Sequence, residues 1–114
     1  MFEEKLGGKL YVDSLEVYKS LVKILSSSGD WIHWSQCMSA AGSIAANIAE
    51  GNGKQRVGGK YYQTFLLHSR GSAYEVVAWL QMGVVDGVVS DCDASTIGAQ
   101  LLDLGDRLLI EIMK

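Results

Sequence analysis

The chain has 114 residues, of which 48% are hydrophobic and 20% charged, so it is long enough for one hydrophobic core and lacks the composition of a disordered protein. Its formal net charge of −3 argues against a general nucleic-acid-binding protein, because such proteins usually carry an excess of basic residues. We expect a single domain over residues 1–114.

The cysteines and the N-terminal residues predict the compartment. Cys37 and Cys92 are too few for a disulfide framework and form no metal-type motif, which is typical of reduced thiols. The first ten residues, MFEEKLGGKL, lack the hydrophobic segment of a signal peptide, and no later hydrophobic run has the length to span a bilayer. The sequence therefore predicts a soluble, cytoplasmic protein with no membrane segment.

Two helices are predicted in the first half, on either side of a turn at residues 26–30. The first covers about 11–26, where hydrophobic residues recur every three or four positions. They form two neighbouring stripes, one of Leu15, Tyr18, Val22 and Leu25 and one of Val17, Leu21 and Ile24. The second helix covers about 31–50, and its many Ala, Ser and Gly residues let a neighbouring helix approach closely. Gly51 is predicted to end it in the left-handed conformation.

Two more helices are predicted in the second half, at about 60–83 and 91–113. Ser90 with Asp93 resembles the capping box that begins a helix. The last helix has more hydrophobic residues than one core needs, which predicts self-association. The candidate oligomer interface residues, which lie off its core-facing stripe, are Leu102, Leu109, Ile110 and Met113.

Four helical segments with short connections indicate the fold class. The absence of proline removes the strongest helix breaker from the whole chain. The Asp-Gly pair within residues 84–89 could also make a hairpin, but each arm would have only two residues, so a turn between helices is favoured. We expect an all-α fold, an antiparallel up-down-up-down four-helix bundle.

The second and third helices carry a family resemblance. The segments SQCMSAAGSIAANIAEGNGK (35–54) and YYQTFLLHSRGSAYEVVAWL (61–80), with LEVYKS at 15–20, resemble the family of 23S rRNA intervening-sequence proteins. The run SIAANIAEG is the most specific part of this likeness. The signature residues that the resemblance implies are Asn47, Glu50, Gly51, Ser72 and Glu75.

The resemblance implies an assembly and a partner class. Members of the family look like homopentamers of four-helix bundles, and no enzymatic activity is established for the family. A fold relative, the accessory protein of diversity-generating retroelements, forms a pentameric ring that binds a reverse transcriptase and RNA through a basic surface. In this chain the family's paired arginines map onto Met38 and Ser39, so this helix face lacks their positive charge.

The signature polar residues have a structural and a catalytic interpretation. Asn47 and Glu50 lie one turn apart, so Asn47 is expected to make cross-helix hydrogen bonds that fix the helix register, while Glu50 pairs with a cation. Catalysis would need a nucleophile beside a base, and the sequence indicates no such arrangement there or at Glu75. His33 and Cys37, four residues apart, supply only two metal ligands. We expect no enzyme activity, no cofactor and no metal site.

A small basic cluster is the candidate nucleic-acid site. It consists of Lys54, Arg56 and Lys60, with Tyr61 and Tyr62 beside it. A solvated loop is the simpler interpretation, but repetition around a ring would let weak sites bind nucleic acid together. Two functions therefore remain open: a non-enzymatic oligomeric scaffold or interaction protein of this family and, as the alternative, a nucleic-acid-binding accessory that acts with a reverse transcriptase and RNA.

Overall fold

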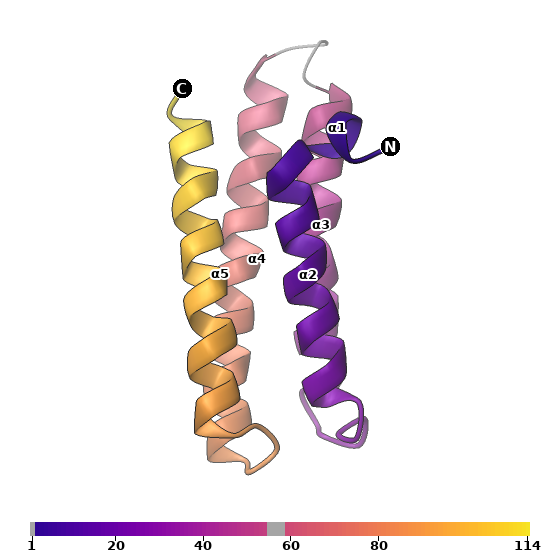
Figure 1. The fold of residues 1–114 in the computed structure, drawn as a ribbon, viewed down its shortest axis with the longest axis vertical. Helices are drawn as coiled ribbons and strands as arrows, with labels where there is room; N and C mark the ends of the chain where they lie inside the picture. The colour runs from indigo at the N-terminus through magenta and orange to yellow at the C-terminus, as the bar shows by residue number, and fades with distance from the viewer. Residues whose placement is uncertain (1, 55–58) are drawn as a thin grey trace.

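Helices make up nearly all of the chain in the computed structural model, which describes residues 2–54 and 59–114 (Figure 1). Within these residues there are five helices and no strand, which confirms the all-α class. The helices are α1 (Glu3–Leu6), α2 (Gly8–Leu25), α3 (Trp34–Lys54), α4 (Gly59–Val85) and α5 (Asp91–Ile112). None of them has the length and hydrophobic character needed to cross a membrane.

The N-terminal helix α1 is absent from the prediction of four helices. It has a single turn, which is too short for hydrophobic periodicity to reveal. Gly7 separates it from α2 with a φ of 133°, and a Cβ at Gly7 would lie 2.5 Å from Cγ2 of Ile48. The junction of α1 and α2 therefore packs directly on α3, and α2 begins at Gly8, three residues before the predicted start.

The prediction that Gly51 ends the second helix is wrong. The helix α3 begins at Trp34 instead of residue 31 and continues through Gly51 to Lys54. Gly51 is buried, and a Cβ there would lie 3.0 Å from Cβ of Phe65 and 3.3 Å from the carbonyl oxygen of Tyr62. The residue is glycine because α4 approaches α3 closely at this point, and not because the chain needs a left-handed conformation.

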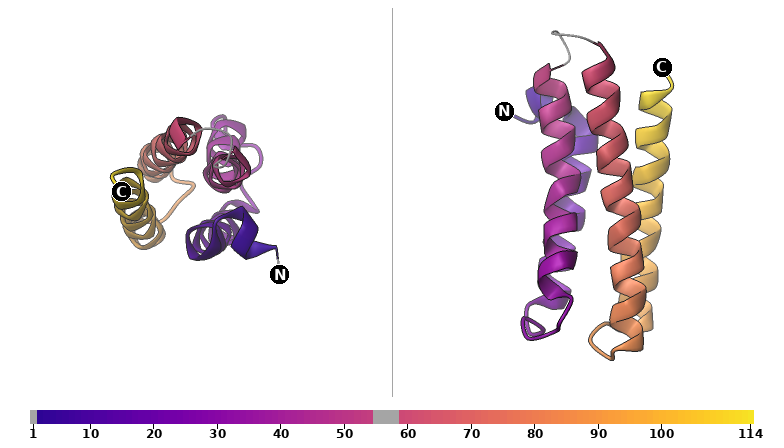
Figure 2. Two further views of the ribbon diagram at one scale, coloured as in Figure 1. Left: turned by 90° about the horizontal axis from the view of Figure 1, so that it is seen from above. Right: turned by 180° about the vertical axis from the view of Figure 1, so that it is seen from behind.

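Each of the four long helices has two long neighbours. α2 packs against α3 and α5, and α4 packs against the same two helices, while α1 lies on α2 and α3 (Figure 2). The core between them consists mainly of aliphatic side chains, with Leu21, Leu25, Ile44, Ile48, Leu66, Val76, Leu80, Leu101, Leu104 and Leu108 fully buried. On α2 the core is formed by Val17, Leu21 and Leu25, whereas Leu15, Tyr18 and Val22 remain exposed.

Polar side chains join separate elements and cap the start of α5. The indole Nε1 of Trp31 donates to Oδ2 of Asp86 at 2.9 Å and so links the α2–α3 connection to the α4–α5 connection. The buried hydroxyl of Ser69 donates to the carbonyl oxygen of Ile44 at 2.8 Å, between α4 and α3. Ser90 caps α5, since its hydroxyl accepts from the backbone N–H of Asp93 at 3.0 Å, which confirms the predicted helix start.

Candidate functional site

The signature polar residues of α3 make local contacts. Asn47 Nδ2 donates to the carbonyl oxygen of Ser43 at 2.8 Å, within its own helix. Glu50 forms an ion pair with Lys54, 3.4 Å between Oε2 and Nζ, and both side chains are about half exposed. The cross-helix hydrogen bond expected from Asn47 is made instead by Ser69. These contacts stabilise α3 and its packing against α4.

The signature residues of α4 lie one turn apart. Ser72 is half-buried, and the exposed Glu75 accepts a hydrogen bond of 3.0 Å from Nε1 of Trp79. Burial, with a smaller contribution from the charge of Glu75, raises the pKa of the Cys37 thiol to about 11. Cys37 therefore stays protonated at neutral pH, and thiols in this form are poor nucleophiles. Over residues 2–54 and 59–114, no three His, Cys, Asp or Glu side chains come close enough to hold a metal ion.

The predicted basic cluster is described only in part. Lys54 is paired with Glu50, and its Nζ also lies 4.8 Å from the ring centroid of Phe65. Lys60 Nζ lies 6.0 Å from the ring centroid of Tyr61. Arg56 falls outside the described residues, so the convergence of the three side chains stays a prediction. The ion pair offsets part of the positive charge that Lys54 would offer to a phosphate.

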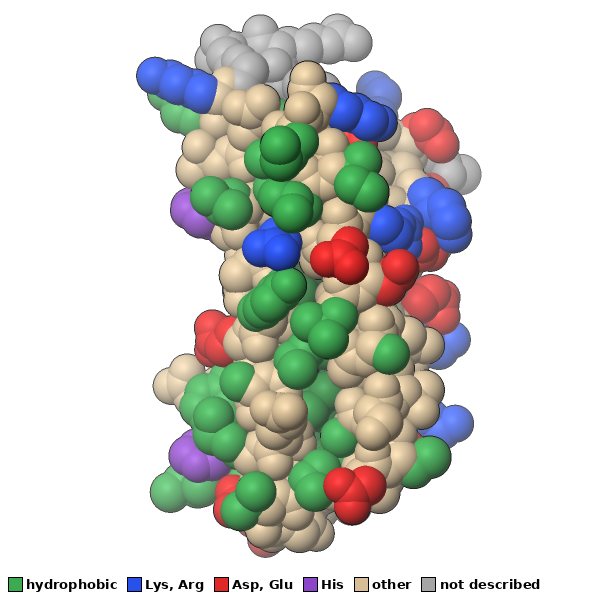
Figure 3. All heavy atoms as spheres, turned by 90° about the vertical axis from the view of Figure 1, so that its left-hand side faces the viewer, with side chains coloured by type: hydrophobic (Ala, Val, Ile, Leu, Met, Phe, Trp, Pro, Cys, Tyr) green, Lys and Arg blue, Asp and Glu red, His purple; other side chains and the backbone are tan. Residues whose placement is uncertain are grey.

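The predicted interface residues are all exposed, three of them on α5 and Met113 directly after it. The exposed fractions are 41% for Leu102, 36% for Leu109, 62% for Ile110 and 76% for Met113. Leu67 and Tyr74, seven residues apart on one side of α4, add two more exposed hydrophobic side chains. We call these six residues the α4–α5 surface. Hydrophobic side chains extend along most of the face that carries α4 and α5 (Figure 3).

Arg70 holds Tyr74 in place on this surface. Its Nε donates to the carbonyl oxygen of Gly105 on α5 at 3.1 Å, and its Nη2 donates to the Tyr74 hydroxyl at 3.1 Å. The guanidinium Cζ also lies 4.7 Å from the centroid of the Tyr74 ring. A Cβ at Gly105 would come within 3.1 Å of the same ring, so glycine lets the tyrosine lie against α5. The ring is thus fixed before any partner binds, which lowers the entropy that binding must remove.

A groove continues the α4–α5 surface toward the α4–α5 connection. Its volume is about 480 Å³, and Leu102 belongs to both features. The hydrophobic and small residues that line it are Val77, Val84, Ala94, Gly98, Ala99 and Leu102, and the polar ones are Gln81, Asp91 and Ser95. The sequence prediction missed this groove, Leu67 and Tyr74, although the seven-residue spacing of Leu67 and Tyr74 was a readable signal.

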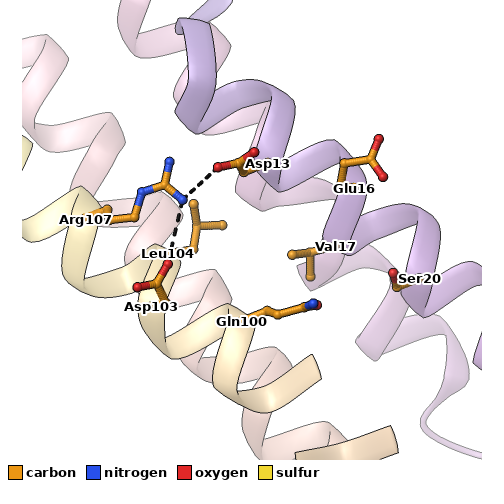
Figure 4. A pocket seen from close by; sticks show the side chains of 8 residues that line it. All are labelled: Asp13, Glu16, Val17, Ser20, Gln100, Asp103, Leu104 and Arg107. Atoms are coloured by element: carbon orange, nitrogen blue, oxygen red, sulfur yellow. Dashed lines mark ion pairs between the residues drawn. The ribbon is translucent and has the colours of Figure 1, made fainter. Parts of the chain in front are cut away.

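A second hollow, of about 300 Å³, lies between α2 and α5 (Figure 4). At its edge, Arg107 Nη1 lies 2.8 Å from Oδ2 of Asp13 and 3.7 Å from Oδ2 of Asp103. Burial acts to raise the pKa of Asp13, but hydrogen bonds from Lys9 and Arg107 outweigh it and lower the pKa below its ordinary value. The ion pair between Asp13 and Arg107 joins α2 to α5 at the edge of this hollow.

Comparison with known proteins identifies a family. The model of the 23S rRNA-intervening sequence protein family matches residues 10–109. No curated protein matches the chain. The likeness to the retroelement accessory proteins stays a prediction. The matched range includes most of α2, all of α3 and α4, and α5 as far as Leu109. Over nearly its whole length, then, the chain belongs to the 23S rRNA-intervening sequence protein family.

Proposed function

We propose that this protein is a non-enzymatic scaffold that assembles with copies of itself through the α4–α5 surface. The observation that carries the proposal is the row of exposed hydrophobic side chains on adjacent helices, from Leu67 and Tyr74 to Ile110. Each large hydrophobic side chain that becomes fully buried contributes about 1.5–3 kcal/mol, so several together supply a strong drive for association. Contiguous hydrophobic patches on a folded surface mark interaction sites.

The proposed repeating unit is an antiparallel up-down-up-down four-helix bundle. Two observations support it: α2 and α4 each pack between α3 and α5, and successive long helices point in opposite directions in Figure 1. The proposed assembly is a homopentamer, a number that comes from the resemblance to the family and not from the surface itself. A rigid unit with its contact residues on helices is suited to such an assembly, because helices position side chains more accurately than loops do.

Light scattering of the purified protein tests this proposal. We expect a mass that is a multiple of the 12.4 kDa chain, five times that mass for the pentamer, at micromolar concentration. A monomer under these conditions would rule out the scaffold proposal. Nucleic-acid binding stays a prediction, since Lys54 is already paired with Glu50 and no contact of the described residues favours RNA over a protein partner.

A further inference from the structure

We propose that the α4–α5 groove binds the exposed hydrophobic stripe of α2 from a second copy of this chain, so that the copies associate head to tail. The α2 stripe consists of Leu15, Tyr18 and Val22. This inference rests on the proposed function, because it names the opposite half of the same interface. It assigns each copy two different contact surfaces, one on α4 and α5 and one on α2.

The α2 stripe is a second hydrophobic face on a helix that already contributes to the core. Leu15 is 41% exposed, Tyr18 37% and Val22 43%, and their spacing of three and four residues places them on one side of α2. The core-facing side of the same helix is formed by Val17, Leu21 and Leu25, which are buried. Tyr18 lies beside Gly42 of α3, since a Cβ at Gly42 would be 3.8 Å from Cε1 of Tyr18. Because residue 42 is glycine, α3 has no side chain at that position to cover Tyr18.

The groove offers space and hydrophobic contacts for such a stripe. A Cβ placed on Gly98 would meet no atom within 4 Å, so the groove is open at the position of this glycine. Val77, Val84 and Leu102 line it on both helices. A row of side chains from one helix, inserted between two others, is the ordinary way in which helices pack.

The charges of the two surfaces are complementary. Beside the α2 stripe lie the exposed Lys19 and Lys23 and the exposed Glu16, so its flank carries one more positive than negative charge. The groove is lined by Asp91, and none of its lining residues is Lys or Arg. Opposite charges across an interface direct the orientation of the partners. If the groove faced its own copy across a twofold axis instead, Asp91 would approach a like charge and the α2 stripe would remain uncovered.

The stripe and the groove lie at overlapping heights along the molecule. Asp13 of α2 contacts Arg107 of α5, and Ser20 lines the same hollow as Gln100, so α2 and α5 run in opposite directions. Both helices rise by the same amount per residue, so residues 15–22 of α2 lie at the same height along the bundle as about residues 98–105 of α5, next to the groove. A rotation about an axis parallel to the helices would bring the stripe of one copy to the groove of the next without a shift along that axis. A head-to-tail contact of this kind closes into a ring when a whole number of such rotations completes a full turn.

Two variants, each of which removes one surface, test the head-to-tail contact. Tyr18→Glu places a charge in the α2 stripe and leaves the groove intact. Ala99→Glu places a charge in the groove and leaves the stripe intact. By light scattering we expect each variant alone to be a monomer, and an equimolar mixture to form a dimer of one copy of each. Ile32→Glu is the control: Ile32 is 84% exposed and lies outside both surfaces, so we expect wild-type assembly.

Other results would overturn the inference. If Tyr18→Glu assembles as the wild type does, or if both variants are monomers whose mixture stays monomeric, the head-to-tail contact is wrong while the scaffold proposal stands. If the wild-type protein is itself monomeric, it is the proposed function that fails. Circular dichroism checks that each variant is folded, and Val22→Glu with Ser95→Glu replaces the first pair if either of its members is unfolded.

Discussion

Arg70 on α4 donates a hydrogen bond of 3.1 Å from Nε to the carbonyl oxygen of Gly105 on α5, at the middle of the α4–α5 surface. The same guanidinium contacts the hydroxyl and the ring of Tyr74. One side chain thus fixes both the packing of the two helices and the orientation of an exposed aromatic ring. An exposed ring held in this way is suited to binding a partner.

Replacement of Arg70 tests this role. We expect Arg70→Met to lower the free energy of unfolding by about 1–2 kcal/mol, because it removes a charged hydrogen bond to the Gly105 carbonyl while keeping much of the hydrophobic stem. Urea unfolding followed by circular dichroism measures the change. Lys5→Met is the control: this exposed basic side chain of α1 belongs to neither of the proposed contact surfaces, and we expect a change within about 0.5 kcal/mol. Equal losses in the two variants would contradict the account.

Two glycines of the long helices should respond to alanine in opposite directions. Gly71→Ala should raise the free energy of unfolding by about 0.5–1 kcal/mol, because its Cβ would meet no atom within 4 Å and alanine favours a helix. Gly51→Ala should lower it by about 1–3 kcal/mol, since its Cβ would press on Phe65 and on the backbone of Tyr62. Urea unfolding of the two variants checks the sign. A stabilised Gly51→Ala protein would show that α3 and α4 are farther apart here.

The buried hydrogen bond of Ser69 should matter more than an exposed bond of equal length. Ser69→Ala removes the 2.8 Å bond to Ile44 across the α3–α4 contact, and we expect a loss of about 1 kcal/mol. Thr64 makes a 2.8 Å bond to the carbonyl of Lys60 on the solvent side of its own helix, where water can replace it. Thr64→Ala is therefore expected to change stability by less than about 0.5 kcal/mol. Thermal melts of both variants measure the two losses of stability. A larger loss for Thr64→Ala than for Ser69→Ala would show that the buried bond is not the more important one.

The two cysteines should differ in reactivity. Cys37 is buried, and its pKa is raised to about 11, first by burial and then by Glu75. In a Cys92→Ser protein at pH 8 we expect thiol reagents to react only after urea unfolds the chain, because the folded state supplies neither access nor thiolate. Cys92 is exposed, so a Cys37→Ser protein should react at once. Fast labelling of Cys37 in the folded protein would contradict the described packing.

The same pKa shift predicts a change of stability with pH. The ordinary pKa of a cysteine thiol is 9.0, so the unfolded chain loses the Cys37 proton above pH 9 while the folded chain keeps it up to about pH 11. The unfolded state then binds fewer protons, and the stability falls as the pH rises through this range. The Cys37→Ser protein should show a smaller fall between pH 9 and 11, measured by urea unfolding.

The residues that could be predicted from the sequence are those whose role follows from periodicity. On α5, Leu101, Leu104 and Leu108 recur every three or four positions and are buried, whereas Leu102 and Ile110, which were predicted to lie off the core-facing stripe, are exposed. Gly51 was misjudged because a glycine late in a helix resembles a helix end, whereas its role depends on how closely α4 approaches. That distance is set by tertiary packing and leaves no periodic signal.

In the candidate site, too, the features that depend on tertiary packing could not be predicted from the sequence. Asn47 is the conspicuous polar residue of its helix, yet Ser69, a small residue on another helix, makes the cross-helix bond. Which of two neighbouring stripes of α2 is buried could not be read from spacing alone, because both are hydrophobic. The groove requires α4 and α5 to be placed side by side, so no single segment of sequence reveals it.

The central claim is that the protein assembles through the α4–α5 surface. Light scattering tests this claim most directly when the Leu102→Glu protein is compared with the wild type and with the Ile32→Glu protein. Leu102 is 41% exposed on that surface. Because a charge at a buried contact costs about 2 kcal/mol or more, we expect the dissociation constant of the Leu102→Glu assembly to be at least roughly 30-fold higher than that of the wild-type assembly. At micromolar concentration the wild type and Ile32→Glu should remain assembled while Leu102→Glu dissociates. A Leu102→Glu protein with the wild-type mass, or a monomeric wild type, would contradict the account.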